Sequence, residues 1–166
     1  MQNAKDTFYL TLRDRLAAVN PARTMALRGV TRPGSLVEEN ELTTAMLPVN
    51  AFCLRWTGLK ISARMAMPLV QMQCEIRYCT DGNAGNGGMD RGRLLAAMDA
   101  ELMAAVNADP QHVAKSKYAA GFVTGAVMET NVFWGDVDFA DVVTQNERLE
   151  RVATVEVFAY QEEGEL

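Results

Sequence analysis

The chain has 166 residues, of which 49% are hydrophobic and 22% are charged. This composition is typical of a globular domain and argues against a disordered chain. The formal net charge of −5 argues against a surface built mainly to hold nucleic-acid phosphates. No window approaches the ~18 uncharged apolar residues of a membrane-spanning helix. We therefore expect one domain over residues 1–166, with no membrane span.

The cysteines indicate the redox compartment. Cys53, Cys74 and Cys79 cannot all pair with one another, and none lies in a CxxC motif. This usage predicts reduced thiols in a protein made in the cytoplasm. Residues 1–6 agree with this prediction, because they lack the basic start and the apolar run of a signal peptide.

The first predicted element is a helix over residues 4–19. Its apolar stripe recurs at helical spacing and consists of Tyr9, Leu12, Leu16 and Val19. Asn3 is the expected N-cap. Proline disfavours helical geometry in the residue before it, so Asn20-Pro21 should end the helix.

Residues 21–48 follow without a sustained hydrophobic period. Pro33-Gly34 and Pro48 interrupt the stretch. It is longer than most connections inside a compact domain, and such segments are often functional or held by a partner. We expect a long irregular segment here.

The centre of the chain predicts a strand, a loop and a second helix. In Leu69–Thr80 the even positions are mostly apolar and the odd positions mostly polar, so one face of the strand should be buried and the other wet. Residues 81–89 contain four glycines and should form a loop. Asp90 is the expected N-cap of an amphipathic helix over residues 90–107.

The remaining elements are expected to be strands and connections. We predict a strand at 49–57, a turn or protruding hairpin at 58–68, and a connector at 111–117. One broken strand or two short ones should follow at 121–134, then an acidic turn at 135–141.

The last predicted strand is Arg148–Tyr160. Apolar groups on both of its faces suggest cover on both sides, one side being covered by a neighbouring subunit, and the tail 161–166 should be exposed. The fold class is α+β, with a mainly antiparallel sheet and two main helices packed on one face.

Two candidates for chemistry lie in the centre of the chain. The Gly-rich loop at 82–90 could attract an anion at the start of a helix, but it fits neither GxxxxGK[ST] nor GxGxxG. His112 is the single histidine, with no second histidine for a metal and no pattern for a triad.

Carboxylates supply the other candidates. Asp136, Asp138 and Asp141 have the spacing that begins a calcium loop, without its glycine and final glutamate. Glu75 and Glu156 sit on predicted strands and could flank each other, although acid–base work needs a geometry that sequence cannot supply. We predict that the protein is not an enzyme and has neither a cofactor nor a metal.

Several residues are candidates for an interface between proteins. Methionine tolerates irregular packing, glycine loops are adaptable, and aromatic residues are enriched at interface centres. Trp134 and Phe139 could equally fill the core. The candidates are Met65, Met67, Gly85, Gly88, Trp134, Phe139, Phe158 and Tyr160.

The order of these elements resembles the tail terminator family of long-tailed bacteriophages. The resemblance lies in an opening amphipathic helix at 6–19 before a long irregular segment. It lies also in a central strand at 70–78 with the helix at 90–107, and in a closing strand at 151–160. These are small α+β proteins without catalytic residues.

The resemblance implies a structural ring subunit in the tail or neck of a virion, made in the host cytoplasm. A homohexameric ring would cap the tail tube and join it to the head. The implied partners are other copies of the chain, the tail tube protein and a head-completion or connector protein. DNA would only pass through the bore.

Two alternatives stay open. One is another head–tail connector or a baseplate component. The other, from a different class, is a small ligand-binding or enzymatic domain that uses the Gly-rich loop 82–90, which an anion bound at 85–90 would support.

Overall fold

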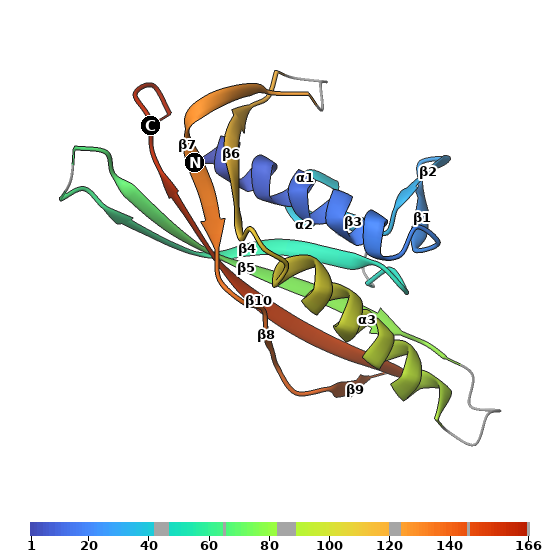
Figure 1. Ribbon diagram of the computed structural model, residues 1–166. Coiled ribbons are helices and arrows are strands. Elements are labelled where there is room, and N and C mark those ends of the chain that lie inside the picture. Colours follow the sequence, from blue (N-terminus) through green and yellow to red (C-terminus); the bar gives the residue numbers. More distant parts are fainter. Residues whose placement is uncertain (42–46, 65, 83–88, 120–123, 146, 166) are drawn as a thin grey trace.

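The computed structural model describes residues 1–166 except 42–46, 65, 83–88, 120–123, 146 and 166 (Figure 1). The helices are α1 (Gln2–Val19), α2 (Glu38–Glu41) and α3 (Asp90–Val106). The strands of the main sheet are β3 (Ser35–Val37), β4 (Phe52–Ser62), β5 (Leu69–Thr80), β6 (His112–Lys117), β7 (Ala126–Trp134), β8 (Asp138–Phe139), β9 (Val143–Gln145) and β10 (Arg148–Tyr160). A separate hairpin consists of β1 (Thr24–Leu27) and β2 (Val30–Pro33).

The main sheet is organised around β10. Its strand order is β3-β4-β5-β10-β7-β6, and among the strand pairs of the described chain β3–β4 alone is parallel. On one edge β10 pairs with β5 from Leu149 to Tyr160. On its other edge it pairs in turn with β9, β8 and β7. Strand β10 therefore joins both halves of the sheet.

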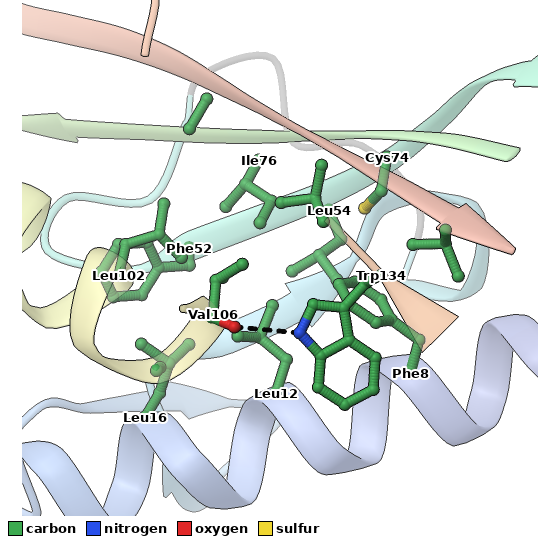
Figure 2. Packing of buried hydrophobic residues seen from close by; sticks show 14 of the residues in the cluster. Phe8, Leu12, Leu16, Phe52, Leu54, Cys74, Ile76, Leu102, Val106 and Trp134 are labelled. Atoms are coloured by element: carbon green, nitrogen blue, oxygen red, sulfur yellow. Dashed lines mark hydrogen bonds between the residues drawn. The ribbon is translucent and has the colours of Figure 1, made fainter. Parts of the chain in front are cut away.

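Both long helices cover the same face of this sheet. Alternate side chains of β5 and β10, such as Ile76 and Val155, are fully buried beneath them, as period-two alternation predicts. In Figure 2, Phe8 and Leu12 of α1 point toward the strands. The Trp134 Nε1–H group donates a hydrogen bond to the Val106 carbonyl at the end of α3, 2.9 Å away. The predicted α+β class, with two helices on one face, is confirmed.

The helix ends differ in detail from the prediction. Met1, and not Asn3, occupies the N-cap position of α1, and the Asn3 amide instead donates to Glu165 in the C-terminal tail. Met89 is the N-cap of α3, so Asp90 is its first residue and not its cap. The end of α1 at Val19, just before Asn20-Pro21, is as predicted.

The expectation of an irregular segment at 21–48 is wrong for most of its described residues. They form β1, β2, β3 and the short helix α2. Contacts with residues distant in the sequence hold these elements in place. The Arg23 side chain forms an ion pair with Glu101 of α3, and the Arg23 carbonyl accepts a hydrogen bond from Gly34 N–H. A β-carbon at Gly34 would lie 3.0 Å from the Arg23 side chain, which favours glycine here. Strands of three or four residues are too short to show a period.

Four other expectations are corrected. The strand expected at 49–57 is β4, which begins at Phe52 and continues to Ser62 after a bulge at Trp56/Gly58. Of the two alternatives for 58–68, the hairpin is therefore confirmed. The connector expected at 111–117 is β6, and the acidic turn contains β8. The tail is not wholly exposed, since Gln161 is buried beside α1.

The cysteines are all free and buried. Burial raises the pKa of the Cys53 thiol to about 12, and it also raises the pKa values of Cys74 and Cys79. Within the described part of the chain, no helix is long and apolar enough to cross a bilayer.

The two faces of β5 predict opposite outcomes for one added carboxylate. Ile76→Asp would bury an unpaired charge, which costs several kcal/mol out of a total stability of about 5–15 kcal/mol. Gln73 is exposed on the other face, so Gln73→Asp should change the free energy of unfolding by no more than about 0.5 kcal/mol. Thermal unfolding followed by circular dichroism checks this. Equal melting temperatures would contradict the assignment of the faces.

Candidate assembly surfaces

The predicted interface residues separate into a core group and a surface group. Trp134 is only 5% exposed and packs edge-on against Phe8, so the core alternative is correct for it. Phe139 is half-buried against the same core, with the Arg151 guanidinium 5.9 Å from its ring. Met67 is exposed. Met65, Gly85 and Gly88 lie outside the described residues.

Aromatic side chains gather on the helix-free face of the sheet. Phe158 of β10 pairs across the strands with the exposed Phe133 of β7. The ring of His112 on β6 lies 5.6 Å from the Phe133 ring. Phe158 and Tyr160 are half-buried. In the part of the chain that the structure describes, helices therefore cover one side of β10, and its second face is partly open.

One end of the sheet carries a projecting hairpin, which we call the β4–β5 arm (residues 57–64 and 66–71). Leu59 and Ile61 pair across the strands with the buried Met72 and Val70. They are nevertheless 53% and 48% exposed. Figure 1 shows the hairpin reaching beyond α1. Leu59 lines a shallow pocket together with Gln2 and Lys5 at the start of α1, which leaves its side chain about half exposed. The exposed Met67 also lies on this arm.

The other end of β10 carries a second exposed apolar site, the β8–β9 segment (residues 136–145). Strand β9 pairs with Arg148–Glu150 at the start of β10. Val142 is exposed, and Val143 is 55% exposed. Asp138 and Asp141 precede these valines in the chain and are exposed too. Figure 1 places this segment at the end of the sheet opposite the β4–β5 arm.

A buried ion cluster ties down the C-terminal tail. Lys115 of β6 is fully buried, and its ammonium group donates to the Tyr160 carbonyl, 2.6 Å away, and to Glu165. Glu162 is 3.6 Å from the same ammonium and accepts hydrogen bonds from the backbone and hydroxyl of Thr130 on β7. Nothing in the local sequence distinguished Lys115 from the exposed Lys117, so sequence reasoning missed this cluster.

The cluster changes the titration of its carboxylates. Burial tends to raise the pKa of Glu165, but hydrogen bonds from Lys115, the Glu162 backbone and Asn3 outweigh it, so the pKa lies below the ordinary 4.5. The pKa of Glu162 is also lowered, because the Thr130 hydrogen bonds outweigh desolvation. Both groups therefore favour the folded state most when they are ionised.

The candidates for catalysis and metal binding are dispersed. Asp136 accepts a hydrogen bond from Gln111, and Asp138 lies on β8 opposite Thr154. Glu75 is ion-paired with Arg55 at 2.7 Å. Among the residues that the structure describes, no three histidine, cysteine or acidic side chains gather as a metal site.

The remaining reactive groups are held in unreactive forms or lie at the surface. Burial raises the pKa of Tyr78, and the Tyr78 hydroxyl donates a hydrogen bond to Asp99. Burial also raises the pKa values of the three cysteines, so all four groups stay protonated. His112 is exposed beside Phe133. Most of the Gly-rich loop, 83–88, is outside the described residues. Its start at Gly82 is packed against Arg91 of α3, which donates to the Gly82 carbonyl.

A comparison with protein-family models finds no match to this chain, and no curated protein matches its sequence significantly.

The ion cluster predicts a loss of stability in acid. Because the folded-state pKa values of Glu162 and Glu165 are lowered, their contribution is present above the unfolded value of about 4.5 and is lost as pH falls below it. Denaturant unfolding from about pH 7 to pH 3 should show this decline. Glu165→Gln should make the decline shallower. The exposed Glu163→Gln is the matched control and should leave it unchanged. Identical pH profiles for Glu165→Gln and the unaltered chain would contradict the cluster's role.

Proposed function

We propose that the protein is a structural subunit of a bacteriophage tail or neck. In this proposal it forms a tail-terminator-like ring that caps the tail tube and joins it to the head. It acts by shape and assembly and carries no catalytic step. Its partners are other copies of itself, the tail tube protein and a head-completion or connector protein.

The observation that carries the proposal is that exposed apolar side chains lie at both ends of the sheet, while others, such as Val30 and Val127, are exposed elsewhere. Leu59 and Ile61 lie at one end of the sheet and Val142 and Val143 at the other. The two ends are joined by the 13 residues of β10, which span about 40 Å at ~3.3 Å per residue. Exposed apolar clusters of this kind mark contact sites with other proteins.

Two different surfaces at opposite ends of a rigid subunit suit a ring. A repeated contact between unlike surfaces is heterologous, and it closes into a ring when the rotation between neighbours allows. A dimer with one self-complementary surface needs only one such site. The order of elements, which resembles that of tail terminators, supports the same conclusion.

The net charge of −5 fits a ring around a DNA path. Like charges repel, so an acidic bore would let DNA pass without holding its phosphates. The helix-free face, with Phe133 and Phe158 partly open, is available for the axial neighbours in the tail or head.

Two experiments test the proposal. Negative-stain electron microscopy of the purified full chain should show closed rings. Deleting the gene from the phage genome that encodes it should give overlong or irregular tails and heads left unjoined. Tails of normal length on complete particles would contradict the proposal, and turnover of ATP or a phosphate ester by the pure protein would favour an enzyme instead.

A further inference from the structure

We infer that the β4–β5 arm of one subunit docks on the β8–β9 segment of the next copy of this chain. The inference rests on the proposed ring and deepens it, because it assigns the two surfaces that meet between neighbouring subunits. It is argued from charge, exposed apolar side chains and free strand edges.

The arm is basic and has no acidic group of its own. Residues 57–74 contain Lys60 and Arg64 but neither aspartate nor glutamate. Both cations are exposed. Among the described residues, neither has an ion-pair partner. The arm that carries Leu59 and Ile61 therefore also presents two positive charges. Glu156 of β10 lines the same groove as Lys60 but forms no ion pair with it.

The β8–β9 segment has the complementary character. Residues 136–145 contain three aspartates and no lysine or arginine. Asp136 is engaged by Gln111, at 2.7 Å. Asp138 and Asp141 are exposed, and no cation of the described chain pairs with either. Asp141 adjoins Val142, and Asp138 pairs with β10 four residues further along than Val143 does, so this segment also combines charge with exposed apolar surface.

Each site also offers a strand edge. Strand β3 pairs with β4 only at Phe52, Cys53 and Leu54, so the outer edge of β4 in the arm has no strand beside it in the described chain. Among the described residues, β9 pairs with β10 alone, which leaves its other edge open there. Open edges readily accept a further strand, and main-chain hydrogen bonds then add to the side-chain contacts.

The two sites cannot meet within one subunit. The arm adjoins Tyr160 and the β8–β9 segment adjoins Arg148, at opposite ends of the same strand. Contact between them therefore requires two copies, and it leaves one free site of each kind for the next copies. Head-to-tail repetition of this contact gives the heterologous interface of a ring.

Charge reversal tests this assignment. We would measure the sedimentation velocity of the full chain at about 50 mM salt, where surface charges are weakly screened. Lys60→Glu with Arg64→Glu should weaken assembly at least tenfold, and so should Asp138→Lys with Asp141→Lys. Lys117→Glu with Arg93→Glu is the matched control, because it changes the net charge as much as the arm variant does at other exposed positions and should assemble normally.

Mixing the two defective variants distinguishes a direct contact from a general charge effect. The reversed arm is acidic and the reversed β8–β9 segment is basic, so each variant complements the other and alternating rings should form. A chain that carries all four reversals should also assemble. Circular dichroism melting shows that every variant is folded before it is scored.

The outcomes separate this inference from the proposed function. If the unaltered chain assembles and the reversals leave assembly unchanged, the assigned interface is wrong while the ring stands. If both reversals abolish assembly but mixing does not restore it, the two sites do not contact each other and the inference is overturned. If the unaltered chain stays monomeric at every concentration, the ring and this interface both fail.

Discussion

The burial of β10 beneath two helices is the interaction on which the rest of the structure depends. Its helix-facing side chains are small or medium in size, with Ala153 and Ala159 flanking two valines, and all four are fully buried. Small groups let α3 approach the strand closely, while backbone hydrogen bonds to β5 and three other strands fix its position. Pairing with β10 fixes the positions of the β4–β5 arm, the β8–β9 segment and the helix-free face.

The Lys115 cluster adds a constraint at one end of β10. A buried ion pair contributes little net stability, because desolvating the charges offsets their attraction. Its effect here is to fix geometry: Lys115 holds the Tyr160 carbonyl and the two tail glutamates, and Glu162 in turn holds β7 through Thr130. The base of the β4–β5 arm, where Leu69 pairs with Tyr160, adjoins this cluster. The Lys115 cluster therefore fixes the part of the sheet from which the arm projects.

The sequence predicted the elements that are long enough to show a periodic pattern of apolar residues. The alternation in β5 placed Ile76 inside and Gln73 outside, and the stripe of α1 placed Leu12 and Leu16 in the core. Ser35–Val37 escaped prediction because its burial comes from pairing with β4 and not from a local pattern. Trp134 was ambiguous for a related reason, since its burial depends on Phe8 and α3, both distant in sequence.

The candidate site was predicted only in part. Met67 and the possibility of a protruding hairpin at 58–68 pointed toward the arm. The acidic run with Asp138 was recognised only as a possible calcium loop or a turn. Its relation to the arm depends on the register of β10, which local pattern does not encode. The burial of a single residue such as Lys115 depends on partners distant in the sequence, so no periodic pattern predicts it.

The central claim is that the protein works by assembling through the two ends of its β10-centred sheet. Hydrogen–deuterium exchange of the assembled and the dilute, dissociated protein tests it most directly, because amides paired across a new interface exchange more slowly. The account predicts new protection in β4 at 57–62 and in β9 at 143–145, with β6 unchanged. Protection confined to the helix-free face around Phe133 and Phe158, with both strand edges unchanged, would contradict it.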